Sequence, residues 1–223
     1  LKTALFTSPF PYNKNMLFAV PSDVPLPENS SFQSFVEDAV VNLILSSCGR
    51  TLVLFTSYES LRSATETARV RLANTGISVL QQGDDDRFRL LDTFKKDAQS
   101  VLFATDSFWE GVDVPGESLS QVIIVKLPFS VPNDPIFAAR AEAIESRGRS
   151  SFMDLSIPEA VIKFRQGVGR LIRHSNDRGC VIVLDRRIYE KRYGKIFLDS
   201  IPECKQMYEP INTICNSVER FLF

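Results

Sequence analysis

The chain has 223 residues, of which 44% are apolar and 24% are charged, and its net charge is −1. These values fit one large or two small globular domains with an ample core, and they exclude a disordered or fibrous protein. They also exclude a uniform polycation. No apolar run approaches the roughly 20 residues that cross a bilayer, and no signal-peptide pattern is present, so we expect an intracellular, cytoplasmic protein without a membrane partner.

The amino-terminal part predicts a short entry segment before the main domain. Residues 1–30 are rich in Pro, Ser and Asn and contain one apolar run, Met16–Val20, so we expect an entry strand and connector there. Residues 31–223 are predicted to form the main domain. Its first element is a helix over Phe32–Ser46, which Gly49 ends.

Short apolar runs then alternate with helical patterns. Strands are predicted over Thr51–Phe55, Ile77–Leu80, Ser100–Ala104, Gln121–Leu127 and Val181–Leu184. Helices are predicted over Ser57–Leu72, Asp86–Lys96 and Asp134–Ser146, and the tail from about Glu203 to Phe223 is expected to form a packed terminal helix. This alternation predicts an α/β sandwich with a mainly parallel sheet.

The run QGVGRLIR, Gln166–Arg173, carries the strongest functional pattern. Ser156 and Glu159 have the spacing of a capping box, so we expect a helix to begin there and continue through this run. At 100° per residue, Gln166, Arg170 and Arg173 fall within about a 60° arc. The apolar residues of this helix cluster on the opposite side: Val161, Phe164, Val168 and Leu171.

Paired arginines suit phosphate recognition because each guanidinium is a planar fork of donors that stays charged. The alternative is that Arg170 and Arg173 are only the solvated face of an amphipathic helix. Gly167 and Gly169 favour the functional interpretation, because each costs a helix about 1 kcal/mol and so calls for a close backbone approach. Basic residues are also crowded between Arg140 and Lys195, which is compatible with phosphates or with plain solvated surface.

Ligands of parallel sheets gather at the carboxyl ends of the strands, and we expect three segments to meet there. Thr56 and Ser57 follow one strand, and Ser57 serves either as an ordinary helix cap or as part of a phosphate site. Residues 105–113 (TDSFWEGVD) follow another strand, and Gln166–Arg173 comes from the helix before a third.

These segments resemble the second RecA-like motor domain of superfamily 2 helicases, specifically the DinG-type branch of the XPD-like DNA helicases. TLVLFTSYESL resembles motif IV of that family, SFWEGVDVPG with LPFSVPNDP resembles the motif V region, and FRQGVGRLIRHSNDRGCVIVLDRR resembles motif VI. TSPFPY resembles the segment that leads into the domain. The motifs occur in family order over nearly the whole chain.

The resemblance implies an ATP-driven translocase that unwinds DNA, with ATP held between two RecA-like domains. Arg170 and Arg173 would act as arginine fingers and Gln166 as a γ-phosphate sensor. Glu110, Gly111 and Asp113 would line the nucleotide cleft beside Gly167 and Gly169. The residues implied near the DNA strand are Thr56, Ser57, Asp106, Ser107, Phe108 and Trp109; Trp109 is either a stacking platform for a base or a core residue.

Other sequence features imply that part of the active site lies elsewhere. The chain has no G-x-x-x-x-G-K-[ST] run, so its RecA-like fold is predicted to lack a P-loop of its own. We therefore expect ATP and Mg²⁺ to be bound mainly by an N-terminal RecA-like domain that precedes Leu1. The scattered Cys48, Cys180, Cys204 and Cys215, with one histidine, predict no metal site here; any iron–sulfur cluster of the family would lie upstream.

The sequence is compatible with two functions. The first is the C-terminal motor domain of an ATP-dependent DNA helicase, inactive alone, whose partners are single-stranded DNA or DNA junctions in the nucleoid. The second is a non-motor nucleic-acid-binding module of a helicase-derived nuclease. A degenerate or absent upstream P-loop would favour the second.

Overall fold

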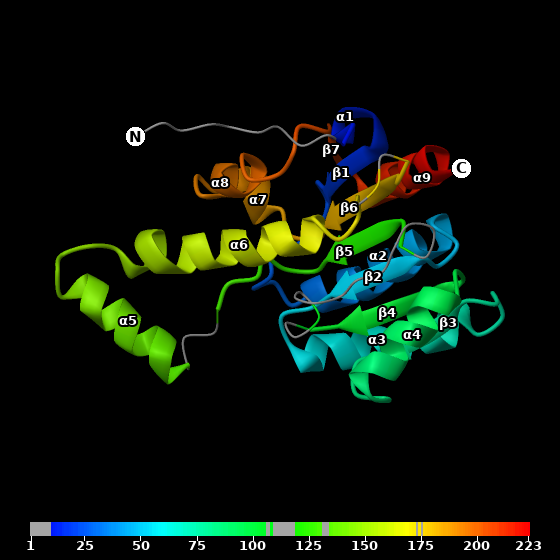
Figure 1. Cartoon of the computed structure of the whole chain (residues 1–223), viewed down its shortest axis with the longest axis horizontal. Coiled ribbons are helices and arrows are strands. Elements are labelled where there is room, and N and C mark those ends of the chain that lie inside the picture. Colours follow the sequence, from blue (N-terminus) through cyan, green and yellow to red (C-terminus); the bar gives the residue numbers. More distant parts are fainter. Residues whose placement is uncertain (1–9, 106–107, 109–118, 131–133, 173, 175) are drawn as a thin grey trace.

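A computed structural model describes residues 10–105, 108, 119–130, 134–172, 174 and 176–223. The described chain forms a sheet of seven parallel strands in the order β3-β4-β2-β5-β6-β1-β7 (Figure 1). The strand bounds are β1 Met16–Pro21, β2 Thr51–Leu54, β3 Ser78–Gln81, β4 Ser100–Ala104, β5 Gln121–Ile124, β6 Gly179–Val183 and β7 Lys205–Glu209.

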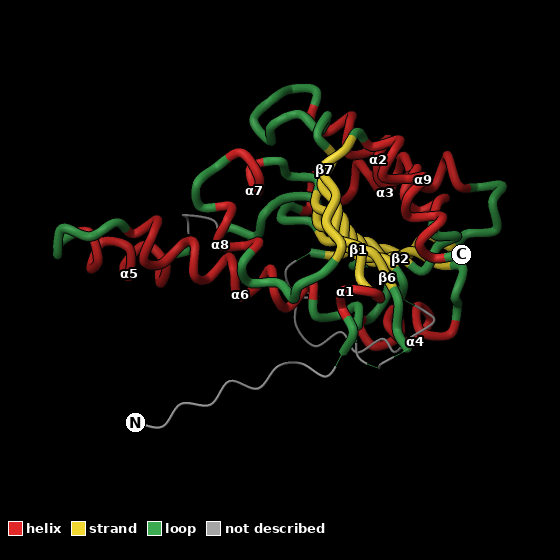
Figure 2. The backbone as a smooth tube through the Cα atoms, turned by 90° about the horizontal axis from the view of Figure 1, so that it is seen from above, coloured by secondary structure: helices red, strands yellow, loops and turns green. Residues whose placement is uncertain are grey.

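The helices pack on both faces of this sheet (Figure 2). Their bounds are α1 Tyr12–Asn15, α2 Phe32–Ser46, α3 Tyr58–Leu72, α4 Arg87–Lys96, α5 Pro135–Glu145, α6 Ile157–Val168, α7 Arg187–Glu190, α8 Gly194–Leu198 and α9 Ile211–Leu222. A π-helical turn, η3 (Phe152–Ser156), runs directly into α6. The predicted three-layer α/β sandwich with a parallel sheet is confirmed.

The two faces of the sheet bury different sets of side chains because successive residues of a strand point to opposite sides. In β1, Phe18 packs toward α6 and α8, whereas Leu17 and Ala19 pack toward α2 and α9. The central strands are buried on both faces, which explains their continuous apolar sequences. The predicted strand at Met16–Val20 lies inside this sheet, between β6 and β7.

Most predicted elements occur within a few residues of their expected bounds, and α2 matches its predicted range. The predicted Gln121–Leu127 strand ends at Ile124, although Val125 and Leu127 remain buried. The prediction for the tail was wrong in part: β7 precedes α9, and Pro210 separates them. Four of the five residues of β7 are exposed, so its sequence lacks the apolar run that marks a buried strand.

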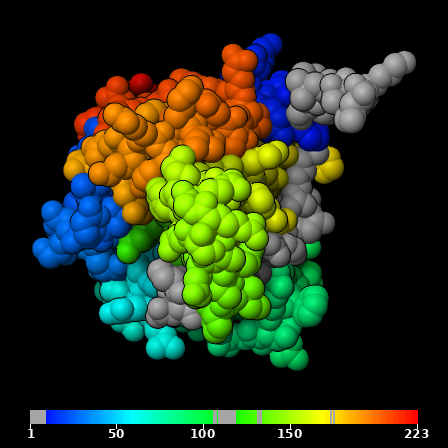
Figure 3. Space-filling model, turned by 90° about the vertical axis from the view of Figure 1, so that its left-hand side faces the viewer, coloured from blue at the N-terminus to red at the C-terminus, as the bar shows by residue number. Residues whose placement is uncertain are grey.

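One part of the fold stands away from the sheet. Helix α5 has no buried residue, and with the start of α6 it extends beyond the carboxyl ends of the strands (Figure 1). The same yellow-green segment forms the foreground of the space-filling view, below the orange residues of α7 and α8 (Figure 3). No described helix is long and apolar enough to traverse a lipid bilayer.

Candidate functional site

The helix that carries Gln166 is shorter than its sequence pattern predicts. Helix α6 ends at Val168, and Gly169 is its C-cap, with its N–H bonded to the carbonyl of Arg165 at 2.8 Å. Arg170 lies beyond the helix, in a tight turn where its N–H bonds to the carbonyl of Gly167 at 3.3 Å. The predicted helical arc of Gln166, Arg170 and Arg173 is therefore wrong, because the helix stops before Arg170.

The start of this helix also differs from its prediction. Ser156 has helical backbone angles and makes no side-chain cap, since the turn of η3 continues through it. Glu159 makes an ion pair with Arg140 of α5 at 2.5 Å instead of closing a capping box. The capping-box prediction was therefore wrong, and the pair ties α6 to the protruding α5.

The apolar side of the helix was predicted correctly. Phe164, Val168 and Leu171 are buried in the core beneath α6, and Val161 packs against the same core. The Phe164 ring makes an edge contact with Phe18 of β1, with ring centroids 6.4 Å apart. This anchoring fixes the side of α6 on which Gln166 lies.

Gln166 is half-buried at the end of α6. Its Oε1 atom is buried and accepts no hydrogen bond from any described residue. A buried amide oxygen without a donor costs about 1–3 kcal/mol, so a water molecule or a ligand is expected to supply the missing donor. Gly167 beside it is buried, and Gly169 is exposed.

The segment after α6 does not lie where the sequence pattern predicts. Leu171 packs directly against Gly179, the first residue of β6. A helix that precedes a parallel strand must return the chain to the amino end of that strand, so this segment lies beside the amino end of β6. The prediction that three segments meet at the carboxyl edge is therefore wrong for the arginine-bearing segment.

Thr56 and Ser57 do lie at the carboxyl edge, directly after β2. Ser57 caps α3 by accepting a hydrogen bond from the N–H of Ser60 at 3.4 Å. Ser57 is exposed and Thr56 is half-buried. Thr105 occupies the equivalent position after β4, and Phe108 beyond it is 2% exposed.

Seven predicted site residues fall outside the described residues. They are Asp106, Ser107, Trp109, Glu110, Gly111, Asp113 and Arg173.

Sequence patterns missed two polar contacts that order the carboxyl edge. The first is Gln82, after β3, whose amide bonds to Tyr58 and Thr105. The second is Asp185, which is fully buried after β6 and accepts hydrogen bonds from the N–H of Leu127 at 3.0 Å and from Arg187. The contacts of Gln82 and the Asp185–Leu127 contact could not be found from spacing along the chain, because they join residues that follow different strands.

The Asp185–Arg187 pair fixes the loops after β5 and β6 together. Nε and Nη2 of Arg187 donate to the two carboxylate oxygens at 2.8 and 2.6 Å, and the guanidinium lies 5.8 Å from the ring centre of Phe129. Burial alone would lower the pKa of Arg187, but the hydrogen bonds and charge of Asp185 outweigh it and raise this pKa. Arg187 therefore stays charged and holds both loops.

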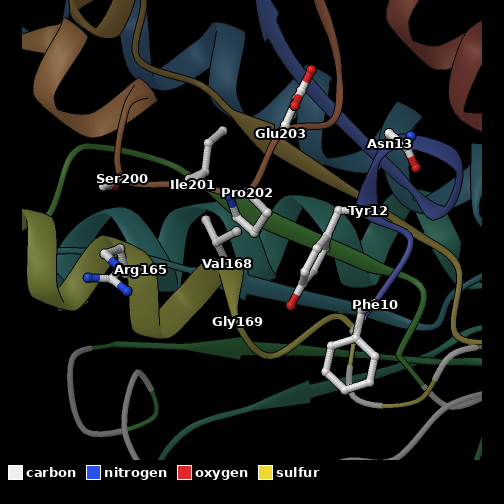
Figure 4. Close-up of a pocket in the computed structure, with 10 residues that line it drawn as sticks. All are labelled: Phe10, Tyr12, Asn13, Arg165, Val168, Gly169, Ser200, Ile201, Pro202 and Glu203. Carbon is white, nitrogen blue, oxygen red and sulfur yellow. The ribbon is translucent and has the colours of Figure 1, made fainter. Parts of the chain in front are cut away.

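A cavity of about 790 Å³ lies beside the end of α6, next to α1 and the chain before β7. Its walls include Phe10, Tyr12, Val168 and Pro202, with Arg165 at one end. Figure 4 shows the Tyr12 ring reaching toward Gly169, with Phe10 below it. Of the predicted site residues, Gly169 lines this cavity.

Comparison with known sequences gives one matching family and several related proteins. Residues 40–204 match the family described as the helicase C-terminal domain. The ATP-dependent DNA helicase YoaA of Haemophilus influenzae is 44% identical over 195 residues, which cover 87% of this chain and 30% of the relative. The ATP-dependent helicase DinG of Mycobacterium tuberculosis is 42% identical over 87% of this chain and 29% of its own length.

A third relative carries a different name. The 3'-5' exonuclease DinG of Bacillus subtilis is 38% identical over 206 residues, which cover 90% of this chain and 22% of the relative. The chain thus spans less than a third of the length of each of these relatives.

Solved structures show the same fold at low sequence identity. An XPD helicase superposes with a TM-score of 0.65 at 18% identity, over 86% of this chain and 35% of that one. Dbp5 of Saccharomyces cerevisiae, bound to RNA and ADP BeF3, superposes with a TM-score of 0.54 at 15% identity, over 95% of this chain and 46% of that one. The sheet and its helices are therefore those of a RecA-like helicase domain, and this chain belongs to the helicase C-terminal domain family, in its DinG-type, XPD-like branch.

Proposed function

We propose that this chain is the second motor domain of an ATP-dependent DNA helicase, which couples ATP hydrolysis to translocation on DNA and to unwinding. The observation that carries the proposal is the end of α6, where Gln166 lies four residues before Arg170 and its buried Oε1 accepts no hydrogen bond from the described part of the chain. Two relatives that cover most of this chain are named ATP-dependent helicases. The complete protein is then intracellular and works on chromosomal DNA.

In this proposal ATP binds between this domain and a first RecA-like domain of the same protein. That first domain holds most of the ATP and its Mg²⁺ ion, so the present chain supplies half of the active site. Gln166 and Arg170 contact the γ-phosphate, together with Arg173. Glu110, Gly111 and Asp113 line the cleft, and Gly167 and Gly169 allow the close approach of the nucleotide.

The chemistry requires fixed positive charge at the γ-phosphate. Phosphoryl transfer proceeds with negative charge spread over the transferring group, and an arginine aimed at that group stabilises the charge without a proton transfer. An amide such as Gln166 can accept a hydrogen bond from the attacking water or donate one to a phosphate oxygen. DNA is held by Thr56 and Ser57 and by the segment from Asp106 to Trp109.

The decisive measurement is ATP hydrolysis by the full-length protein with Arg170→Ala. We expect kcat to fall about a thousandfold or more while nucleotide affinity changes little, because the arginine acts on the transition state. Arg170→Lys should stay impaired, since an ammonium cannot replace the planar guanidinium.

The matched control is Arg165→Ala, which removes an exposed arginine of the same helix one turn earlier. It should keep kcat within about twofold, as exposed substitutions usually do. If Arg170→Ala hydrolysed ATP at the wild-type rate, the role assigned to Arg170 would be wrong. If Arg165→Ala lost as much kcat as Arg170→Ala, the loss would reflect a general disturbance of α6.

The second candidate is a nucleic-acid-binding module of a nuclease, which the name of the Bacillus subtilis relative favours. It predicts that the full-length protein degrades single-stranded DNA from a 3' end without ATP. Digestion of end-labelled DNA with and without ATP separates the two candidates. DNA cleavage without ATP hydrolysis would support the module, and ATP-dependent strand separation without cleavage would support the motor.

A further inference from the structure

We infer that Gln82 is a positioning residue that holds the two DNA-facing loops of this domain in their binding arrangement. The inference rests on the proposed function, since it assumes that the loops after β2 and β4 contact DNA. It assigns a role to a residue outside the motif IV, V and VI segments.

The contacts of Gln82 span three neighbouring strands. Gln82 follows β3, and its backbone N–H donates to the carbonyl of Phe103 in β4 at 2.9 Å. Its side-chain Nε2 donates to the hydroxyl of Tyr58, after β2, at 2.6 Å. Its Oε1 accepts two hydrogen bonds from Thr105, after β4, from the N–H at 2.7 Å and from the hydroxyl at 3.0 Å.

This arrangement follows from the order of the sheet, in which β3, β4 and β2 are adjacent. All three strands are parallel, so their carboxyl ends lie at the same edge. A glutamine directly after β3 can therefore reach over the end of β4 to the loop after β2. Its amide supplies the acceptor that Thr105 needs and a donor for Tyr58, which an apolar side chain of the same length cannot do.

Both partners of Gln82 adjoin residues assigned to DNA. Tyr58 is the first residue of α3 and directly follows Ser57. Thr105 directly precedes the segment from Asp106 to Trp109, and its carbonyl accepts a hydrogen bond from the N–H of Phe108 at 2.9 Å. The amide of Gln82 therefore fixes the direction in which the chain leaves β4 relative to the start of α3.

A second contact supports the same loop from the same side. The guanidinium of Arg87, at the start of α4, lies 5.2 Å from the ring centre of Phe108, which is 2% exposed. Gln82 and Arg87 thus contact Thr105 and Phe108, which a backbone hydrogen bond joins. Tyr58 is 53% exposed, so the bridge ends at the solvent surface where a nucleic acid strand can approach.

The test measures DNA-stimulated ATP hydrolysis by the full-length protein with Gln82→Met, which keeps side-chain length and removes the amide. We expect the DNA concentration for half-maximal stimulation to rise about fivefold to tenfold, the effect of one or two lost ordering hydrogen bonds. The rate without DNA should stay within about twofold, because the substitution leaves the end of α6 untouched.

Two further variants make the test specific. Gln99→Met removes a glutamine just before the amino end of β4, at the opposite edge, and should leave DNA stimulation unchanged. Tyr58→Phe removes one end of the bridge at an exposed position, and should weaken DNA binding less than Gln82→Met. In the double variant the two losses should be less than additive, because both act through one contact.

The outcomes separate the inference from the proposed function. If the wild-type protein is stimulated by DNA and Gln82→Met has the same DNA dependence, the positioning role is overturned. An equal loss of the rates with and without DNA would also overturn it, since this shows only a fold defect. If the wild-type protein neither binds DNA in an anisotropy assay nor hydrolyses ATP, the proposed function fails, and the inference fails with it.

Discussion

At the scale of single residues, the buried carboxylate of Asp185 joins the loops after β5 and β6 at the carboxyl edge of the sheet. It is fully buried and accepts hydrogen bonds from the N–H of Leu127 and from both the backbone and the side chain of Arg187. The sequence pattern indicates the strand that ends before Asp185. It gives no sign of Leu127, which lies 58 residues earlier in the chain.

Removing that carboxylate should destabilise the fold. Asp185→Ala leaves the Arg187 guanidinium, 23% exposed, without its partner and the N–H of Leu127 without an acceptor. The expected loss is about 3 kcal/mol in the free energy of unfolding, as for one partner of a buried ion pair. Urea denaturation at pH 7 measures it.

Asp185→Asn is the control, because it keeps one acceptor for Leu127 while removing the charge. It should cost less than Asp185→Ala. A change below about 0.5 kcal/mol in the alanine variant, the size usual for surface substitutions, would contradict the structural role given to this pair.

At the scale of elements, Glu37 joins α2 to α3. Its carboxylate accepts hydrogen bonds from Ser63 and Thr67 of α3 and from Gln33 of its own helix. Burial raises the pKa of Glu37, but the three hydrogen bonds outweigh burial and the net pKa is lowered. Because the charged form is favoured in the folded state, Glu37 stabilises the protein above its unfolded pKa.

The stability from Glu37 should therefore be present above about pH 4.5 and disappear as the pH falls through the lower, folded pKa. In Glu37→Gln this part of the pH dependence should be absent. Urea denaturation of both proteins between pH 3 and 6 gives the comparison. If the free energy of unfolding changed with pH in the same way in both proteins over this range, the carboxylate of Glu37 would not be the source of the pH dependence.

For helix α6, the sequence pattern predicts the buried face correctly but not the length of the helix. Its apolar face was predicted from periodicity, and Phe164 and Val168 are buried as expected. The pattern does not predict where the helix ends, because it places Gly167 and Gly169 inside a longer helix, as points of close backbone approach. The structure uses Gly169 as the helix terminus, and Leu171 then packs on Gly179.

At the scale of the whole molecule, two hydrophobic cores, one on each face, pack against one continuous sheet. The central strands β1, β2, β4, β5 and β6 contribute side chains to both cores, so loss of either core removes support from the same backbone. We expect the isolated chain to unfold in one cooperative transition. Far-UV and near-UV circular dichroism should give coincident urea curves, since the second signal reports on the packing of the buried aromatic rings.

Phe164→Ala tests this cooperativity. Phe164 is fully buried between Phe18 and Phe197, and its truncation should cost about 3–5 kcal/mol. The whole transition should move to lower urea with both probes still coincident. Two separated transitions would show that the faces of the sheet unfold independently.

The sequence by itself determined the alternation of strands and helices, the parallel sheet and the identity of the motif residues. These properties are local: a run such as residues 52–54 is apolar throughout because both of its faces are covered, and Ser57 caps the helix that follows it. The pattern of the exposed β7 is weak because an edge strand has little to bury.

Only the tertiary structure decided which of these segments meet. The order of the strands brings Gln82, Thr105 and Tyr58 to one hydrogen-bonded bridge, although 23 and 24 residues separate the partners from Gln82. The return of the chain to the amino end of β6 places the segment after α6 away from Ser57. Such contacts depend on strand order and on where each helix ends, and neither is set by residues that are neighbours in sequence.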